Sequence, residues 1–271
     1  MTEFLKHTLD PATAMRRQLG LLIADNHVDV LVFSRAEDNS LTHERVMLDI
    51  SHADHVTSLE DMVYNNPLLL SDFSHVDVLF DTRRFMVVPA EAVDASPYML
   101  EQLYAGDNID VIASEINDAG TVIAAAVDPR LSAFVRRTFH NPGLHHRLAP
   151  MARWFGLRNR LGNSSKLHLH LTPGRLDILG YHGRDMSIVN TFEVRSELDA
   201  LYYAQAIADL TGFDTNSDQM FLSGDSAMRE KAMPLMRKYF SYVMPVIFPS
   251  DMFRAGSDAL RAPFELVSLH N

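Results

Sequence analysis

Residues Leu19–Ser34 have the sequence LGLLIADNHVDVLVFS, in which two apolar runs flank the polar turn Asp25-Asn26-His27. Two apolar runs around a polar turn predict a β-hairpin. The stretch Leu167–His182, LHLHLTPGRLDILGYH, has the same pattern 148 positions later, with its turn in the same place. The sequence therefore predicts one hairpin in each half of the chain.

The two stretches align residue by residue, because the shift places Leu21 on Leu169 and Val30 on Ile178. Each hairpin is followed by a third strand, a helix and a further apolar strand, as the alternation of apolar residues indicates. We therefore predict two copies of one unit. Their hairpins should superpose, belong to separate sheets and turn towards a shared interdomain cleft.

Capping patterns mark where the helices begin. Thr57 with Glu60 and Ser196 with Asp199 have the capping-box spacing, and Asp128 precedes a proline at the first helical position. The helix after Ser196 should end at Gly212, with Leu198, Leu201, Tyr202 and Ile207 facing its sheet. The other predicted elements are strands 45–51, 75–80, 85–88, 109–117, 121–127, 188–194, 219–223 and 243–248, and helices 97–104, 129–140, 144–161, 227–242 and 255–271.

The length of 271 residues and a hydrophobic content of 47% suit a two-domain globular protein. Residues 162–165, Gly-Asn-Ser-Ser, form the best linker, which predicts a first lobe at 1–162 and a second at 163–271. The start of the chain has no apolar run typical of a signal peptide, and no window approaches the roughly 18 apolar residues of a membrane span. With no cysteine either, we expect a cytoplasmic protein without disulfides or thiolate metal sites.

The net charge of −11 is unevenly distributed, because residues 129–176 contain nine Lys or Arg and no Asp or Glu. Such a segment can bind an anionic partner, or it can pair with the acidic remainder of its own fold. The arginines concerned are Arg136, Arg137, Arg147, Arg153, Arg158 and Arg160. We favour the internal pairing, since aromatic residues do not interleave with the basic ones as they do on a nucleic-acid stacking surface.

The chain resembles a bacterial family, domain of unknown function 3822, described as having an actin-like ATPase fold. The resemblance rests on LLIADNHVDVLVFS in the first half, and on LHLTPGRLDILGYHGRDMSIVNTFEV and LDALYYAQAIADLTGFD in the second. Three antiparallel strands, a helix and a further strand, occurring twice, is also the order of duplicated ribonuclease-H-like proteins such as actin and sugar kinases. The resemblance implies an α/β, duplicated ribonuclease-H-like (actin-like ATPase) fold with two lobes and an interdomain cleft.

Members of the actin-like superfamily hold a nucleotide through glycine-bearing turns, whose N–H groups contact phosphate, and through carboxylates that hold hydrated magnesium. Here the first turn keeps Asp25, but His27 stands at the expected glycine. The second turn contains Pro173, which has no N–H to donate. The adenosine turn would lie near Gly224, with one glycine of the expected two.

We therefore predict a non-catalytic protein of actin-like fold, a cytoplasmic scaffold or partner-binding module for an unknown protein, with no catalytic residue, no metal site and no cofactor. One alternative is a divergent ATP-binding protein or ATPase that binds magnesium-ATP. Its degenerate nucleotide cleft would use Asp25, Asn26, Gly174, Gly224 and Asp225. Another is an anion or nucleic-acid binder through the basic segment 129–176. Nucleic-acid binding is not expected, and the oligomeric state stays open.

Further residues with possible chemistry are interpreted structurally. His168 and His170 alternate on one strand, and His145 and His146 are neighbours, without carboxylate partners at ligand spacing. We interpret these histidines as structural. Asp29 and Asp177 occupy equivalent positions of the two hairpins and are predicted to point to solvent on the polar faces of their strands.

Overall fold

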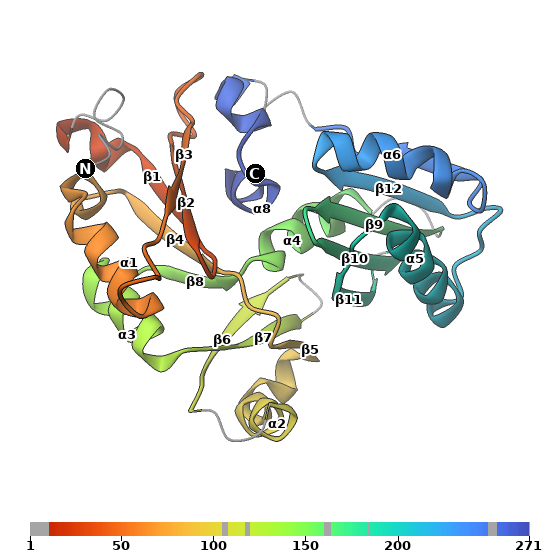
Figure 1. Ribbon diagram of the computed structural model, residues 1–271, viewed down its shortest axis with the longest axis horizontal. Coiled ribbons are helices and arrows are strands. Elements are labelled where there is room, and N and C mark those ends of the chain that lie inside the picture. Colours follow the sequence, from red (N-terminus) through yellow and green to blue (C-terminus); the bar gives the residue numbers. More distant parts are fainter. Residues whose placement is uncertain are drawn as a thin grey trace. The chain divides into compact units, whose positions relative to one another are not determined.

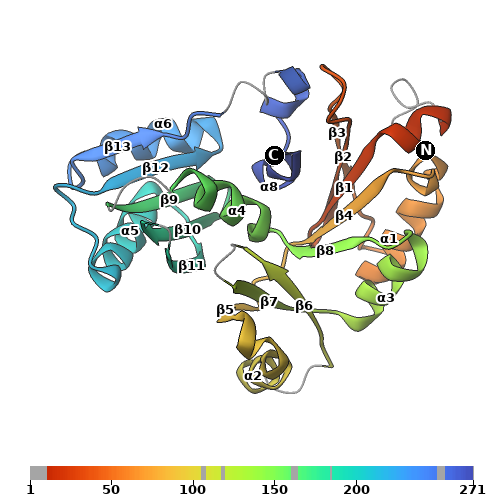
Figure 2. The same ribbon diagram turned by 180° about the vertical axis from the view of Figure 1, so that it is seen from behind.

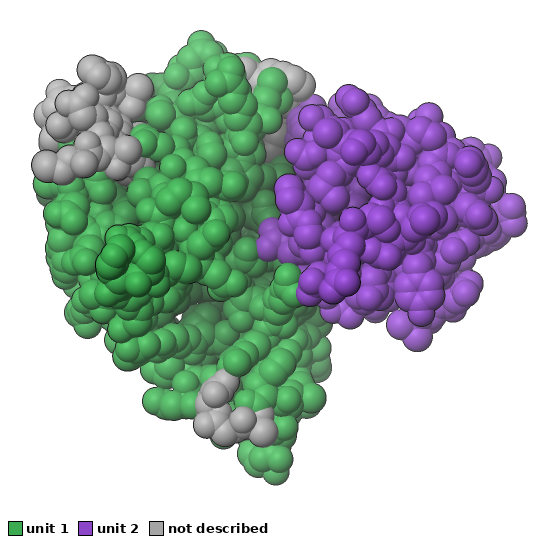
Figure 3. Space-filling view, in the orientation of Figure 1, with its two compact units in different colours: residues 1–116, 120–151, 249–271 green, residues 117–119, 152–248 purple. Residues whose placement is uncertain are grey.

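The computed structural model describes residues 11–104, 108–116, 120–159, 164–183, 185–248 and 254–270, which form an α/β protein with three sheets (Figures 1 and 2). The chain divides into two compact units, coloured in Figure 3. Unit 1 contains residues 1–116, 120–151 and 249–271, and unit 2 contains residues 117–119 and 152–248. Each unit is built around a five-stranded sheet.

The main sheet of unit 1 has the strand order β3-β2-β1-β4-β8. Its strands are β1 (Gln18–Ile23), β2 (His27–Phe33), β3 (Thr42–Met47), β4 (His75–Phe80) and β8 (Gly143–His146). The first three strands pair antiparallel, and β4 and β8 continue the sheet in parallel beside β1. Because β1 lies at the centre, its residues are buried on both faces and are almost all apolar.

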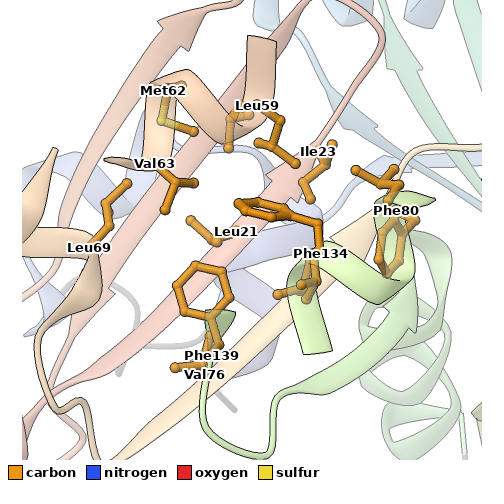
Figure 4. Packing of buried hydrophobic residues seen from close by; sticks show 14 of the residues in the cluster. Leu21, Ile23, Leu59, Met62, Val63, Leu69, Val76, Phe80, Phe134 and Phe139 are labelled. Carbon is orange, nitrogen blue, oxygen red and sulfur yellow. The ribbon is translucent and has the colours of Figure 1, made fainter. Parts of the chain in front are cut away.

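One face of this sheet packs against α1 (His55–Tyr64) and α3 (Pro129–Thr138). The apolar residues that alternate along β1, β2 and β4 meet Leu59, Met62 and Phe134 of the two helices in one core, which Figure 4 shows from close by. Asp128 caps α3 as predicted, since its side chain accepts a hydrogen bond from the Arg130 backbone N–H. This face is a conventional hydrophobic core.

The opposite face of the same sheet, called here the second face of unit 1, carries Gly20, Asp29 and Asp77. The C-terminal segment covers part of it with η4 (Ser257–Leu260), α8 (Phe264–Val267) and η5 (Ser268–His270). A Cβ on Gly20 would lie only 3.3 Å from Leu266 and 3.4 Å from Leu269, so the missing side chain gives these leucines room to pack. The long C-terminal helix predicted at 255–271 is replaced by these three short turns.

Unit 1 also contains a small antiparallel sheet of order β5-β7-β6. It consists of β5 (Phe85–Pro89), β6 (Asp110–Glu115) and β7 (Thr121–Val127), and η3 (Ala90–Ala95) and α2 (Ser96–Leu103) pack on it (Figure 1). The turn predicted at 118–120 between β6 and β7 lies mostly outside the described residues. The remaining turns of unit 1 are η1 (Pro11–Arg16) and η2 (Pro67–Leu70).

The sheet of unit 2 has the order β11-β10-β9-β12-β13, the same arrangement as in unit 1. Its strands are β9 (Ser165–Thr172), β10 (Arg175–His182), β11 (Asp185–Glu193), β12 (Gln219–Gly224) and β13 (Tyr242–Pro245). One face packs against α5 (Glu197–Thr211) and α6 (Ser226–Met236), and the other, the second face of unit 2, meets residues 152–158 of α4 (Leu148–Arg158). The predicted capping box of Ser196 and Asp199 and the left-handed Gly212 are present on α5.

The two central hairpins pair in matching registers, in agreement with the predicted alignment of Leu21 with Leu169 and of Val30 with Ile178. Leu21 pairs with Val30 in β1–β2, and Leu169 pairs with Ile178 in β9–β10. The same equivalent positions are therefore paired within each hairpin. Both central strands also pair in parallel with the next strand of their unit. The hairpins lie in separate sheets, as expected. The common origin of the two sheets by duplication stays an interpretation of this similarity.

Several local predictions are wrong. Asp54, and not Thr57, caps α1, because its carboxylate accepts hydrogen bonds from the N–H groups of residues 56 and 57. The helix predicted at 144–161 is preceded by strand β8, which depends on pairing with β4 and has only four residues to signal it. Leu198 and Tyr202 are exposed on α5, whereas Leu201 and Ile207 are buried as predicted.

The two compact units differ from the lobes predicted at 1–162 and 163–271. Unit 2 begins inside α4, and residues 249–271 belong with unit 1. The predicted boundary between residues 162 and 163 lies outside the described residues and stays a prediction.

Candidate functional site

The turn between β1 and β2 carries Asp25 and Asn26, both exposed. The Ala24 N–H donates to the His27 carbonyl oxygen over 3.0 Å and closes the turn, and the Asn26 carbonyl accepts from Leu48 N–H over 2.9 Å. Asn26 Oδ1 lies 2.7 Å from Nδ1 of His27, the residue at the expected glycine. This turn is therefore ordered by its own side chains and by the segment after β3.

The corresponding turn of unit 2 is Thr172-Pro173-Gly174-Arg175 between β9 and β10. Gly174 has φ of 76°, as the residue after proline in a type II turn requires, and a Cβ there would meet no atom within 4 Å. Pro173 offers no N–H to an anion. The guanidinium of Arg175 turns back towards its own strand, with Nε 3.5 Å from Oδ2 of Asp177. The turn geometry explains this sequence without a ligand.

Gly224 is the last residue of β12 and Asp225 follows it, at the same end of the unit 2 strands as the turn with Gly174. A Cβ on Gly224, whose φ is 97°, would lie 2.0 Å from the carbonyl oxygen of Leu171, so the glycine makes room for the protein's own backbone. The Asp225 N–H donates to that same oxygen over 2.7 Å. Its carboxylate accepts from Met228 N–H over 2.9 Å and caps α6.

The structure thus brings three of the five predicted site residues together, Gly174, Gly224 and Asp225 in unit 2. Asp25 and Asn26 lie in unit 1, and the predicted cleft that would join the two sets stays a prediction. Of the two aspartates, Asp225 is engaged in helix capping, whereas Asp25 has no described hydrogen bond to another described residue.

Asp81 of unit 1 occupies the position equivalent to Asp225. Its N–H donates to the carbonyl oxygen of Ile23, and the N–H of Asp225 donates to that of Leu171, the residue equivalent to Ile23. Its carboxylate lies 2.6 Å from Nε of Arg147, whose side chain is completely buried. Arg147 Nη1 lies 3.7 Å from the buried carboxylate of Glu265 in α8. Arg147 thus pairs within its own fold, the interpretation favoured for the basic segment, with two acidic partners that are distant in sequence.

Asp29 is fully buried on the second face of unit 1, which corrects the prediction that it points to solvent. Arg45 donates to both carboxylate oxygens, over 2.9 and 2.8 Å, and His43 Nε2 lies 2.8 Å from Oδ1. Burial raises the pKa of the Asp29 carboxyl, but the hydrogen bonds from His43 and Arg45 outweigh it and lower the pKa below its usual value. Asp29 is therefore a paired anion.

The equivalent Asp177 in unit 2 is also fully buried, again contrary to the prediction. The Thr191 hydroxyl donates to its carboxylate over 2.6 Å from the adjacent strand. The third strand of each unit carries the sequence signal for the burial of these aspartates. The residues paired directly opposite them are polar, Arg45 for Asp29 and Thr191 for Asp177. A buried carboxylate needs a hydrogen-bond partner, and a polar side chain on the paired strand can supply it.

A second ionic group on this face centres on Asp77. The Nε2 atoms of His75 and His145 each lie 3.2 Å from its Oδ1. Burial raises the pKa of Asp77, and the hydrogen bond from His145 together with the nearby His75 lowers it further than burial raises it. His145 thus contacts a carboxylate that its spacing in the sequence did not indicate.

His168 in unit 2 lies between two aromatic rings, with centroids 3.9 Å from Phe155 and 5.1 Å from Phe221. Its Nε2 is 3.1 Å from the amide nitrogen of Asn159. Burial lowers the pKa of His168 to about 3, with a smaller contribution from Lys166. His170 Nδ1 lies 2.9 Å from the Ser223 hydroxyl. Both buried histidines fit the structural interpretation.

The basic segment contains several arginines with acidic neighbours in their own unit. Arg137 forms an ion pair with Glu60, and Arg130 lies 2.9 Å from Asp128. Arg158 stacks on the ring of Trp154, with its guanidinium carbon 3.6 Å from the ring centroid. Arg160 lies outside the described residues. These contacts agree with internal pairing.

The described part of the chain contains no cluster of three or more His, Asp or Glu side chains that could hold a metal ion. No helix in the described ranges is long and apolar enough to span a membrane. Of the two predicted site carboxylates, Asp225 caps α6 and Asp25 is exposed, and Asp81, at the position of unit 1 equivalent to Asp225, pairs with Arg147.

Comparison with known proteins supports the fold. A solved protein from Bacteroides thetaiotaomicron with an actin-like ATPase fold and unknown function is 16% identical, with a TM-score of 0.78, covering 97% of this chain and 98% of that one. PilM in the PilM–PilN type IV pilus biogenesis complex is 11% identical, with a TM-score of 0.58, covering 93% and 96%. The sequence model of a family described as "Protein of unknown function (DUF3822)" matches residues 6–243. No curated protein matches the sequence. The predicted actin-like ATPase fold is confirmed.

Proposed function

The chain belongs to the DUF3822 family of proteins of unknown function, and from that premise we propose that it is a pseudo-ATPase, a non-catalytic scaffold or partner-binding module of the cytoplasm. The observation that carries the proposal is the occupation of the turn at Gly224 and Asp225. The glycine accommodates the Leu171 carbonyl and the carboxylate caps α6, so neither is available to a nucleotide in this arrangement.

The residues at the other turns support the same proposal. Phosphate binding by this kind of fold uses backbone N–H groups at glycine turns, but Pro173 cannot donate and His27 replaces a glycine. Asp81, which follows β4 in unit 1, is paired with the buried Arg147. Catalysis would need a carboxylate that can hold magnesium or orient a water molecule.

A protein-binding role is consistent with proteins of similar fold. PilM is found in complex with PilN, which shows that a protein of this architecture can take a protein partner. Fold similarity alone does not transfer that role. The proposal for this chain therefore depends on the loss of nucleotide-binding features, and the similarity to PilM is secondary support.

The alternative of a divergent ATP-binding protein is favoured by one observation, the exposed Asp25 at the end of β1. Its carboxylate is the one member of the predicted site that no described contact engages. The alternative of a nucleic-acid binder is weakened by the carboxylate partners of Arg130, Arg137 and Arg147.

Thermal unfolding with and without excess magnesium-ATP tests the proposal directly. A ligand at 100 times its dissociation constant stabilises the native state by about 2.7 kcal/mol, which is a clear upward shift of Tm. We expect no shift and no release of phosphate. A shift that requires magnesium and disappears in Asp25→Asn would overturn the pseudo-ATPase proposal in favour of the divergent nucleotide site.

A further inference from the structure

Helix α5 is apolar on two sides. Its inner side packs on the sheet of unit 2 through residues such as Leu201, Ala204 and Ile207. On its outer side Leu198, Tyr202 and Leu210 expose 65%, 66% and 73% of their surfaces, with the exposed Ala206 between them. We call residues 198, 202, 206 and 210 the α5 stripe.

The spacing of four residues places the α5 stripe along one face of the helix. A helix at the surface of a globular protein normally has polar residues on its outer side. Single exposed apolar residues are common and need no explanation, but a continuous row over three turns marks an interaction site. None of the four stripe residues belongs to the buried core cluster of unit 2.

The central side chain of the stripe is held in place before any partner arrives. The Tyr202 ring contacts Tyr203 edge-on, with centroids 5.3 Å apart, and Tyr203 stacks on Phe192 of β11 at 4.3 Å. An ordered aromatic ring loses little conformational entropy on binding, and tyrosine is enriched among the residues that dominate interface energies.

The charges on α5 indicate the kind of partner. The helix carries Glu197, Asp199 and Asp209 and has no Lys or Arg. Asp209 lies near the C-terminal end, where the helix dipole disfavours a negative charge, and no described lysine or arginine pairs with it. A cationic group on a partner would offset the unfavourable interaction of Asp209 with the helix dipole and would give its carboxylate an ion-pair partner.

A second copy of the chain fits this surface less well. Two α5 helices packed antiparallel about a two-fold axis would bring Asp209 of one copy towards Glu197 and Asp199 of the other. Like charges facing each other across an interface oppose association. The electrostatics therefore favour a different, basic partner.

We propose that the α5 stripe docks an amphipathic helix of a protein partner, with an apolar row that covers Leu198, Tyr202 and Leu210 and with Lys or Arg beside it. The inference rests on the proposed partner-binding function and specifies its surface. The stripe spans about 18 Å at 1.5 Å per residue, which matches a partner helix of about four turns. Such a small contact gives weak, reversible binding in the micromolar range.

The test uses the full chain and a fluorescein-labelled synthetic helix of about 16 residues, with leucines on one face and lysines on both flanks. We expect saturable binding by fluorescence anisotropy. The double variant Leu198→Ser/Leu210→Ser should weaken it at least tenfold. The matched control Tyr98→Ser/Leu103→Ser removes two similarly exposed apolar residues from α2 in unit 1 and should leave the affinity within twofold. A peptide of the same composition in scrambled order controls for general attraction to an acidic protein.

Charge exchange provides the second arm. Asp209→Lys should weaken the lysine peptide and strengthen a matched peptide that has glutamates in place of lysines. The Trp154 fluorescence and Tm of each variant verify that unit 2 is folded.

Equal binding by the stripe and control variants, or no binding of the lysine peptide, would overturn the proposal. Self-association of the chain that is lost in Leu198→Ser/Leu210→Ser would also overturn it, since the occupant would be a second copy. The magnesium-ATP experiment does not involve α5, so failure of the stripe and failure of the pseudo-ATPase proposal remain distinguishable.

Discussion

The second faces of the two five-stranded sheets have the same backbone arrangement, and each buries an aspartate at the equivalent position, but the other groups on them differ. In unit 1 this face holds ionic groups, with Asp29 bound by Arg45 and with Arg147 between Asp81 and Glu265. In unit 2 it keeps the buried Asp177 but also holds aromatic groups, with His168 stacked between Phe155 and Phe221 and with Tyr181 hydrogen-bonded to Ala152. Strand order and hairpin register are nevertheless the same.

Because the second faces differ while strand order and register are the same, the faces that pack against the helices must specify the fold. The faces that pack against α1 and α3, or against α5 and α6, are filled with alternating aliphatic residues in both units. Those residues specify register, because a slip by one position would turn all of them away from the core. The second faces can then be filled by ion pairs or by stacked rings, provided that each buried polar group has a partner.

The largest expected effect is that of Arg147→Met in unit 1. It leaves the buried Glu265 without its arginine, and removing one partner of a buried ion pair costs about 3–5 kcal/mol. Urea unfolding followed by circular dichroism measures the loss, and hydrogen exchange in β1 and β4 locates it. The control Arg254→Met breaks the exposed pair with Asp38 and should cost at most about 1 kcal/mol.

The double variant Arg147→Met/Glu265→Leu sharpens this result, because replacing both members of a buried pair by apolar residues is often neutral or stabilising. It should recover much of the stability lost by Arg147→Met. A loss below about 1 kcal/mol for the single variant would show that the charged face of unit 1 is no more sensitive than a surface ion pair.

Gly224→Ala in unit 2 should have the next largest effect. The new Cβ would collide with the Leu171 carbonyl at a positive φ, and backbone strain of this kind costs up to about 3 kcal/mol. Gly174→Ala is the matched control, since its φ is also positive but no atom lies within 4 Å, and it should cost about 1 kcal/mol. Urea titrations followed by Trp154 fluorescence report on unit 2. Equal losses would mean that the contact with Leu171 can relax at no cost.

The smallest effect concerns the response of unit 2 to acid. The pKa of His168 is about 3 in the folded protein, below the value of about 6.5 in an unfolded chain. Between these values the unfolded state binds the additional proton, so stability falls by about 1.4 kcal/mol for each pH unit below about 6.5. In His168→Gln this contribution should disappear from urea titrations at pH 7, 6 and 5.

Asp29 of unit 1 should respond in a different pH window. The pKa of Asp29 is lowered by His43 and Arg45 against the effect of burial, so the stability that Asp29 contributes is present above the unfolded pKa of about 3.9. It is lost only as the pH falls below that value. If the stability of His168→Gln fell as steeply with acid as that of the parent protein, the burial of His168 would not be the cause.

The register of both hairpins follows from the sequence, because side chains alternate along a strand and the apolar positions specify its buried face. Leu21 opposite Val30 and Leu169 opposite Ile178 are examples. The caps at Asp128 and Ser196 are equally predictable, since they depend on residues within one helical turn. These local patterns, together with the order of elements, were sufficient to identify the fold.

Other features depend on residues that are far apart in the chain. The four residues of β8 form a strand because β4 lies beside them, and Arg147 is buried because Asp81 and Glu265 reach it from positions 66 residues before and 118 residues after it. Gly224 and Asp225 resemble part of a nucleotide turn in sequence, yet in space they meet the Leu171 carbonyl and the start of α6. The sequence by itself determined the alternating core faces and hence the fold, because periodicity is a local property. Only the tertiary structure decided which polar groups are buried, paired or exposed, because their partners are brought together by folding.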